Sequence, residues 1–412
     1  MSESTLPVSE KAQNHITLAM VSLYFIVWGS QFLGNSFLPI YISSLPFATS
    51  ATIGLATALG ALITALMQPI WGIIADHART KNFILMVALL GVAATVWLFI
   101  LPRHNSLTTL LLSIAALYLF LLAPQALTDT IVVENMPRVR LRFGAIKCFS
   151  SGGAAGMAIV VSFIQDIDTN TAFMLMSAVA LLALLPLFFM PPTKGHAHGG
   201  GAAKKIGLRE VLQNKRLLLL LAFGVCHFSS VSCLNTFLGV YFATSAGLNA
   251  GIGMFSLLSA ISITLEAALM LVGSKFINRL NVYTVFLLAP LAGVGRSLII
   301  FLAPNAFVMM TSAIFHALMF GPLWVRMAPY IRSIVPGEMR ATGQGLWSIM
   351  SAGIGPIFGS LLGGLLSGAL GGLRNVFLVT SCLLALVAVV FFFLFRRQRA
   401  TDEAEGFSIR EG

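Results

Sequence analysis

Long apolar runs alternate with short polar segments along almost the whole chain. Twelve runs reach the length of about 20 residues that a helix needs to cross the hydrocarbon core of a bilayer. They lie near 16–42, 52–75, 83–102, 107–134, 143–165, 170–191, 216–244, 252–276, 282–303, 306–332, 341–368 and 373–395. Because a backbone in lipid must satisfy its own hydrogen bonds, these runs predict an all-α membrane protein with twelve transmembrane helices.

The longest polar segment, residues 193–215, separates the sixth run from the seventh. It predicts an N-terminal six-helix half (1–192), a cytoplasmic linker (193–215) and a C-terminal six-helix half with a short tail (216–412). Two such halves facing each other across a central cavity are typical of secondary transporters. His196 and His198 in this segment are either metal ligands or part of a solvated linker, and we favour the linker.

The composition agrees with lipid as the main solvent. The 412 residues are 58% hydrophobic and 9% charged, with a mean hydropathy of +0.92, whereas a soluble domain carries about a quarter charged residues. The formal charge of +11 is explained by basic loops on the cytoplasmic side. No basic stripe with interleaved aromatic residues lies outside the apolar runs, so we expect no nucleic-acid partner.

The distribution of basic residues predicts the orientation in the membrane. With the N-terminus inside, the outer loops hold little more than Arg103 and Arg374, and the inner loops hold the following residues: Arg79, Lys81, Arg138, Arg140, Arg142, Lys194, Lys204, Lys205, Arg209, Lys215, Arg216, Lys275, Arg279 and Arg340. The first fifteen residues lack the basic start of a signal peptide. We therefore expect a multi-pass plasma-membrane protein, in a bacterial inner membrane, with both termini in the cytoplasm.

The sequence gives no sign of catalytic or cofactor chemistry. Its four cysteines lie inside apolar runs and have no metal-binding spacing. It has no nucleophile elbow, phosphate-binding glycine loop or nucleotide-binding domain. We expect no enzyme, no metal and no cofactor, with protons as the coupling ion.

Asp129 and Lys147 are the first candidates for a functional site. Asp129 lies within the fourth apolar run, and Lys147 lies near the head of the fifth. Ionisable groups within a membrane are expensive and mark transport pathways by default. The alternatives are a static ion pair for Asp129 and, for Lys147, a side chain that reaches out to the membrane edge. Gln125, one helical turn before Asp129, would join the same face.

The second half carries five further candidates. Glu266 is the one acid of the eighth run, and Arg296 and His316 lie mid-run in the ninth and tenth. Asn235 offers a neutral hydrogen-bonding group on the seventh run. His316 can titrate near neutral pH, or it is a satisfied core residue. Arg326 either faces the cavity or lies at the inner interface.

Glycines recur at intervals of four in two runs. The eleventh run has Gly355, Gly359 and Gly363, followed by Gly364 and Gly368, and the fifth run has Gly152, Gly153 and Gly156. Such spacing predicts close helix packing.

A short motif links the second and third runs. Residues 68–76 read QPIWGIIAD, and residues 277–280 (INRL) form a degenerate second copy at the matching place in the second half. The motif resembles the signature between helices two and three of the major facilitator superfamily, which implies its twelve-helix fold and a role in conformational change. Taken alone, Asp76 would be a solvated loop acid. The motif residues are Gly72, Asp76, Arg79, Lys81, Asn278 and Arg279.

The chain further resembles the branch that contains lactose permease and the phenylpropionate-type proton symporters. The matching features are FLPIY at 37–41, the 18-residue spacing of Asp129 and Lys147, the 20-residue spacing of Arg296 and His316, Glu266, and RATGQG at 340–345. The chain departs from the permease at Ala154, Ser232, Asn235 and Met319. The resemblance therefore implies transport without specifying a galactoside.

Together these patterns predict a monomeric proton-coupled symporter that imports a small polar organic solute, a sugar or oligosaccharide as the first guess. Protons would be carried by Asp129, Glu266 and His316. Substrate would be bound by Gln125, Lys147, Asn235, Arg296, His316 and Arg326. The alternatives are uptake of an organic anion such as an aromatic carboxylate, a drug-type proton antiporter, and a non-transporting sensor or integral enzyme.

Overall fold

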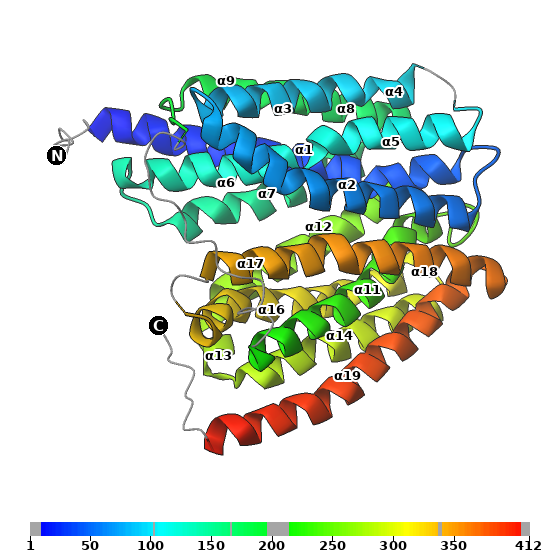
Figure 1. Ribbon diagram of the computed structural model, residues 1–412. Helices are drawn as coiled ribbons and strands as arrows, with labels where there is room; N and C mark the ends of the chain where they lie inside the picture. Colours follow the sequence, from blue (N-terminus) through cyan, green and yellow to red (C-terminus); the bar gives the residue numbers. More distant parts are fainter. Residues whose placement is uncertain (1–9, 102–103, 165–166, 196–213, 337–339, 405–412) are drawn as a thin grey trace. The chain divides into compact units, whose positions relative to one another are not determined.

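The computed structural model describes residues 10–101, 104–164, 167–195, 214–336 and 340–404 (Figure 1). Every regular element in these ranges is a helix. Twelve helices are long and apolar enough to cross a membrane: 10–43, 50–77, 81–100, 107–138, 143–163, 169–188, 215–243, 251–272, 282–302, 306–334, 342–369 and 373–403. The prediction of twelve long apolar helices is confirmed.

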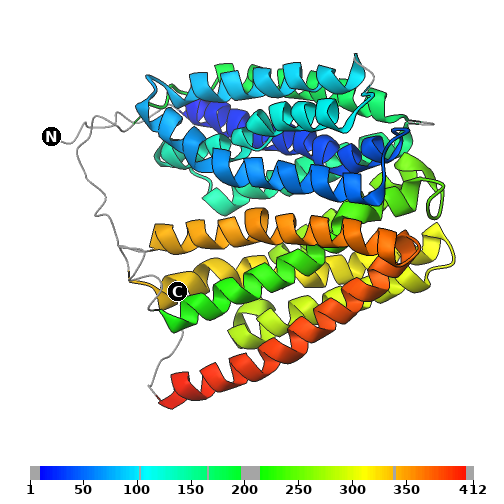
Figure 2. The ribbon, with the colours of Figure 1, turned by 45° about the vertical axis from the view of Figure 1, so that its right-hand side comes forward.

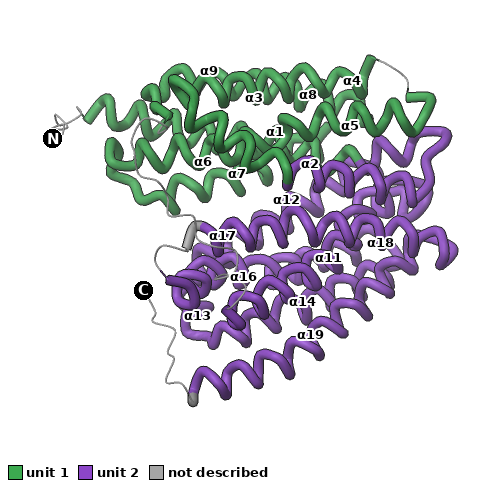
Figure 3. The backbone as a smooth tube through the Cα atoms, in the orientation of Figure 1, with its two compact units in different colours: residues 1–38, 66–201 green, residues 39–65, 202–412 purple. Residues whose placement is uncertain are grey.

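The chain forms two compact units, which Figure 3 colours separately. Unit 1 contains residues 1–38 and 66–201, and unit 2 contains residues 39–65 and 202–412. The first helices are α1 (Glu10–Ser43), α2 (Ser50–His77), α3 (Lys81–Thr95), α4 (Trp97–Ile100), α5 (Leu107–Leu121), α6 (Ala123–Asn135), η1 (Met136–Arg138), α7 (Phe143–Phe163), α8 (Thr169–Leu182) and α9 (Leu184–Phe188).

The second half of the chain continues the helical pattern through unit 2. Its helices are α11 (Lys215–Ala243), α12 (Gly251–Val272), α13 (Ser274–Arg279), α14 (Val282–Leu302), α15 (Ala306–Met310), α16 (Ser312–Ile334), α17 (Arg340–Ser348), the π-helical segment η3 (Ile349–Ile354), α18 (Gly355–Ala369) and α19 (Leu373–Ala404). Residues 196–213, with His196 and His198, lie outside the described residues, so the division of the chain at this linker remains a prediction.

Residues 39–65, the end of α1 and the start of α2, belong to unit 2. A hydrogen bond connects this segment to α18. Ser367 Oγ, near the end of α18, donates to Ser50 Oγ at the start of α2, at 2.8 Å. A Cβ on Gly54 would lie 3.1 Å from the Cα of Gly364. Glycine at both positions therefore permits the two backbones to approach.

The core of unit 1 follows a helical period. On α3, the side chains of Leu85, Ala88, Leu89 and Val92 are at most 1% exposed, and their spacing places them on one face. The indole of Trp71 on α2 donates to the carbonyl of Leu119 at 2.7 Å, so its polar atom is satisfied within this core.

The core of unit 2 is aromatic. Phe223 of α11 lies 5.7 Å from Phe286 of α14 and 5.3 Å from Phe391 of α19, measured between ring centroids. Phe286 in turn lies 5.2 Å from Tyr330 of α16. Four helices thus meet around one group of rings. In the turned view of Figure 2, α19 lies along the outside of this unit. Such ring pairs add to the stabilisation that burial alone provides.

Several helices have a side chain that caps the backbone N–H groups of the first turn. The carboxylate of Asp168 accepts the backbone N–H of Thr171 at 2.8 Å at the start of α8. The hydrogen bonds from Thr171 hold the pKa of Asp168 below its usual range. Asn305 caps α15 in the same way, through the N–H of Val308 at 3.0 Å.

The predicted glycine packing is present for most of the glycines. A Cβ on Gly359 of α18 would collide with the carbonyl of Ser229 on α11, and one on Gly153 of α7 with the carbonyl of Phe25 on α1. A Cβ on Gly368 would meet no atom within 4 Å. The expectation of close packing is therefore wrong for Gly368, because no atom of the described residues lies beside it near the end of α18.

Candidate functional site

Asp129 of α6 and Lys147 of α7 form an ion pair inside unit 1. The ammonium of Lys147 lies 2.6 Å from Oδ1 and 2.5 Å from Oδ2 of Asp129. Both side chains are 37% exposed, so the pair is accessible at one side. Lys147 thus extends toward Asp129. The roles of both residues in transport stay predictions.

Aromatic side chains that were not predicted from the sequence lie beside this pair. The hydroxyl of Tyr24 on α1 donates to Asp129 Oδ1 at 2.6 Å. The ammonium of Lys147 lies 5.3 Å from the ring centre of Trp28, 5.6 Å from that of Tyr24 and 5.9 Å from that of Phe143. A cation within about 6 Å of an aromatic face is attracted by the ring. The site in unit 1 is therefore an ion pair enclosed by three rings.

Gln125 lies one turn before Asp129 on α6 and is half-buried. In the described part of the chain, no hydrogen bond joins Gln125 to Asp129 or Lys147. The amide of Gln125 thus lies close to Asp129 along α6 without a hydrogen bond to the ion pair. The predicted contact of Gln125 with substrate stays a prediction.

Glu266 of α12 and His316 of α16 are paired in unit 2. Nε2 of His316 lies 3.1 Å from Oε2 of Glu266, and the two side chains are 16% and 19% exposed. The ring of Phe320 lies 4.8 Å from that of His316. Two of the three predicted proton-carrying residues are therefore in direct contact.

Arg296 of α14 contacts Asn235 of α11 in the same unit. Nη1 of Arg296 donates to Oδ1 of Asn235 at 3.0 Å. The arginine is 3% exposed, whereas Asn235 is exposed. The charge of Arg296 is also close enough to that of Glu266 for the two to attract each other. The predicted cation, amide, acid and histidine of the second half thus form one polar group of residues.

Arg326 is buried at 7% exposure and donates to the backbone carbonyl of Asn278 at 3.2 Å. Ten residues separate it from His316 on α16, which corresponds to about 15 Å along a helix. Arg326 therefore contacts the second motif copy through Asn278, and its contact with substrate stays a prediction. Arg279, the last residue of α13, is exposed.

The first motif copy is centred on Lys81. Its ammonium lies 3.0 Å from Asp76 and 2.6 Å from Glu134, and the lysine side chain is 1% exposed. Its backbone N–H donates to the carbonyl of Thr193 at 2.7 Å. Asp76, at 53% exposure, is therefore a solvated acid that also pairs with a buried cation.

Gly72 and Arg79 of the motif are both exposed. A Cβ built on Gly72 meets no atom of the described residues within 4 Å. In the described part of the chain, Arg79 forms no ion pair. The part of both residues in conformational change stays a prediction.

Residues whose importance depends on helix packing were not predicted from the sequence. Tyr24 and Trp28 are spaced four apart, which places them on one helix face, but a tyrosine and tryptophan in an apolar run are common. Glu134 follows Asp129 by five residues. As a second acid in the fourth apolar run, it could have been recognised from the sequence as a candidate site residue.

Among the described residues, no group of three or more His, Cys, Asp or Glu side chains is arranged to hold a metal.

Comparison with known proteins assigns the chain to a family. The model of the MFS_1 like family matches residues 17–379. The chain belongs to this family. The family and the similar proteins are transporters, so the chain is a multi-pass membrane transporter of the major facilitator type and not an enzyme, as the sequence predicted.

Individual relatives are distant in sequence. The uncharacterized transporter YwbF of Bacillus subtilis (strain 168) is 21% identical over 337 residues, covering 79% of this chain and 82% of YwbF. A mutant of the nucleoside transporter NupG superposes with a TM-score of 0.79 at 18% identity, covering 92% of this chain and 100% of NupG. A bacterial homolog of the human lysosomal transporter Spinster, inward-facing and unoccupied, gives 0.72 at 15% identity, covering 94% and 98%. These structures share the fold of this chain.

Proposed function

We propose that this transporter is a proton-coupled symporter that imports a small, neutral, polar organic solute rich in hydroxyl groups. A sugar or oligosaccharide is the first candidate. The balance of charges at the two polar groups of residues carries this proposal. In unit 1 the charge of Lys147 is matched by Asp129, and in unit 2 the charge of Arg296 is matched by Glu266. A substrate that brings its own charge would leave one of these groups uncompensated in a low-dielectric setting, which is costly.

The same balance disfavours the two alternative substrates. Uptake of an organic anion would need a cation without an acidic partner at these groups of residues. Lys147 lies beside Asp129, and Arg296 is attracted by Glu266. Export of an apolar cation would need an acid without a partner. Asp129 and Glu266 each contact a basic side chain. A neutral solute can exchange hydrogen bonds with these groups without removing their charge.

Nucleosides are a second candidate within the same substrate class. NupG, which shares the fold, is a nucleoside transporter. A nucleoside is neutral and carries a sugar, so the exposed amide of Asn235 and the half-exposed Asp129–Lys147 pair would suit it as well as a sugar. The fold likeness alone does not separate the two.

Asp129 and Glu266 are proposed to carry the protons. Each acid is hydrogen-bonded to a basic group, so gaining a proton would release that group for substrate. His316 would share the proton with Glu266, because Nε2 of its imidazole lies 3.1 Å from Oε2 of Glu266. Lys147, Arg296, Asn235 and Gln125 would orient the substrate.

We place the monomer in a bacterial inner membrane with both termini in the cytoplasm. The excess of lysine and arginine in alternate loops supports this orientation. Reporter fusions at the C-terminus and in the loop after Leu101 should report opposite sides of the membrane.

Uptake into proteoliposomes with an inward proton gradient tests the proposed function. The panel would contain maltose, lactose, uridine, adenosine, phenylpropionate and ethidium. We expect accumulation of a neutral compound, with loss of accumulation in both Asp129→Asn and Glu266→Gln. Gradient-driven uptake of phenylpropionate alone, or unchanged accumulation in both variants, would contradict the proposal.

A further inference from the structure

We infer that Arg396 and Arg397, near the end of α19, bind the headgroup of an acidic phospholipid. The two arginines follow the last apolar residues of the helix, and both are exposed. Such a lipid site lies on the outward face of α19, and it is separate from the transported solute and from proton coupling.

The inward face of α19 is covered by unit 2 itself. Phe391, Phe395 and Asp402 are at most 5% exposed. Intervals of four and seven residues place all three on one side of the helix. The rings of Phe391 and Phe395 lie 5.3 Å and 5.6 Å from the ring of Phe223 on α11, measured between centroids. This side therefore has no room for a lipid.

The other side of α19 carries an exposed apolar stripe. Its side chains recur at intervals of three and four residues and are each at least 42% exposed: Leu386, Val389, Val390 and Phe393. A continuous apolar face that the protein leaves exposed marks a surface for membrane contact. Because a helical turn takes between three and four residues, Arg396 and Arg397 continue the same stripe one turn after Phe393.

The length of the apolar segment places the two arginines at headgroup depth. Residues 376–395 carry no charged side chain. At the rise of an α-helix this segment is about 30 Å long, which is the thickness of the hydrocarbon core of a bilayer. Arg396 and Arg397 are the next two residues, so they lie where the hydrocarbon ends and the lipid phosphates begin.

The later charges of α19 are already paired. Nε of Arg399 lies 2.8 Å from Oε1 of Glu403 on the same helix. Nε of Arg216 on α11 lies 2.8 Å from Oδ1 of Asp402. Each pair is neutral as a whole, so these four residues neither add to nor cancel the charge of Arg396 and Arg397.

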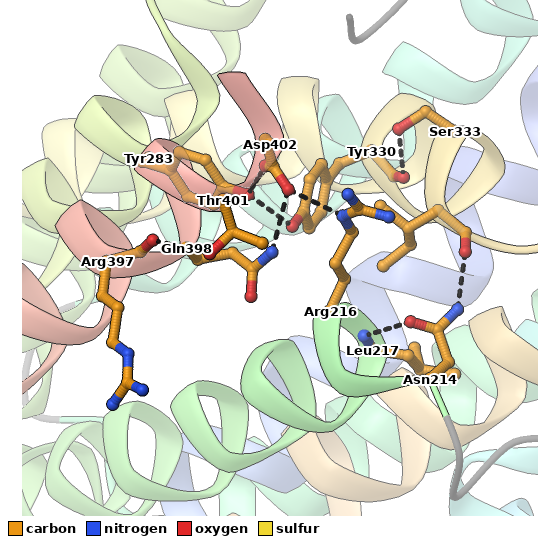
Figure 4. Close-up of polar contacts among 11 residues, drawn as sticks. Asn214, Arg216, Leu217, Tyr283, Tyr330, Ser333, Arg397, Gln398, Thr401 and Asp402 are labelled. Carbon is orange, nitrogen blue, oxygen red and sulfur yellow. Dashed lines mark hydrogen bonds and ion pairs between the residues drawn. The ribbon is translucent and has the colours of Figure 1, made fainter. Parts of the chain in front are cut away.

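Arg396 and Arg397 have no such partner. In the part of the chain that the structure describes, no acidic side chain pairs with either of them. Figure 4 shows the guanidinium of Arg397 directed away from the residues around Asp402. A guanidinium binds phosphate oxygens through paired hydrogen bonds. Two uncompensated cations therefore favour an acidic headgroup over a zwitterionic one.

Photocrosslinking of the full-length protein in nanodiscs tests the inference. The discs contain phosphatidylcholine with a trace of phosphatidylglycerol that carries a photoreactive diazirine in its headgroup, and mass spectrometry after digestion with pepsin locates the adducts. We expect adducts at the end of α19. Arg396→Gln and Arg397→Gln should each lower their yield about fivefold, and the double variant about 30-fold. Replacing both arginines by lysine should retain most of the yield, because the charge remains.

A matched control changes the same end of the helix without changing its net charge. Arg399→Gln combined with Glu403→Gln should leave the yield within about twofold of the wild type. The same diazirine on phosphatidylcholine should give few adducts there. Equal yields from the two lipids, or an unchanged yield when Arg396 and Arg397 are both glutamine, would overturn the inference. Full competition by free glycerol phosphate would also overturn it, since it would mark a site for any small anion.

The other occupant that the apolar stripe could take is a second copy of the chain. Two copies in each nanodisc, without lipid adducts on α19, would assign the stripe to a contact between copies and would overturn the inference. No transport is measured in these experiments, so their outcome is independent of the proposed symport.

Discussion

Arg216 and Asp402 are 186 residues apart in the sequence, and Nε of Arg216 donates to Oδ1 of Asp402 at 2.8 Å. Figure 4 shows that further groups of unit 2 converge on the same carboxylate. It accepts from Gln398 at 2.8 Å and from the hydroxyl of Tyr283 at 2.6 Å. The Tyr283 hydroxyl also lies 3.3 Å from that of Tyr330. This carboxylate therefore connects the beginnings of α11 and α14 with the ends of α16 and α19.

Replacing Asp402 should destabilise the protein. The side chain is 5% exposed, and Asp402→Ala leaves three donors without their acceptor. We expect a loss of about 2–3 kcal/mol in the free energy of unfolding, measured by denaturation in mixed micelles with circular dichroism. The adjacent acid provides the control, because Glu403 is 66% exposed and pairs with Arg399 on the surface. Glu403→Ala should change stability by less than about 0.5 kcal/mol, and an equal loss in both variants would refute the anchoring role.

The cluster at Lys81 should show a graded response. Lys81→Met leaves two carboxylates beside each other without a cation, so it should lower the free energy of unfolding by about 3 kcal/mol. Glu134→Gln should cost more than Asp76→Asn, because Glu134 is closer to the ammonium and 22% exposed whereas Asp76 is 53% exposed. Denaturation of the three variants in parallel gives the order. If Asp76→Asn were the most damaging of the three, the assignment of Glu134 as the main partner would be wrong.

His104 should make stability depend on pH. It is 4% exposed, its Nε2 lies 3.0 Å from Ser113 Oγ, and burial lowers its pKa. The unfolded chain then binds protons more readily than the folded one, so the contribution to stability is complete above about pH 6.5 and is lost as the pH falls through the folded pKa. Denaturation at pH 8 and at pH 5 should show a loss that is smaller in His104→Gln. The exposed His15→Gln is the control and should retain the full loss, and a wild-type loss in His104→Gln would contradict the assignment.

The candidate site was partly predictable. The sequence was enough to identify four charged candidates, because a charge in an apolar run is energetically costly and usually functional. They are Asp129, Lys147, Glu266 and Arg296. Their partners could not all be found this way. Tyr24 belongs to a residue type that apolar helices carry routinely, and it lies 105 residues from Asp129 in the sequence.

The sequence by itself determined that this chain is a membrane protein with twelve helices. Hydropathy and helix length are properties of each segment alone, and lipid imposes the same hydrogen-bonding requirement on all of them. Only the tertiary structure decided that Tyr24 donates to Asp129, that three rings including Tyr24 lie around Lys147, that Glu134 joins Lys81, and that Asp402 anchors the last helix. Those contacts depend on the rotation and depth of each helix against its neighbours, which the packing of many side chains sets together.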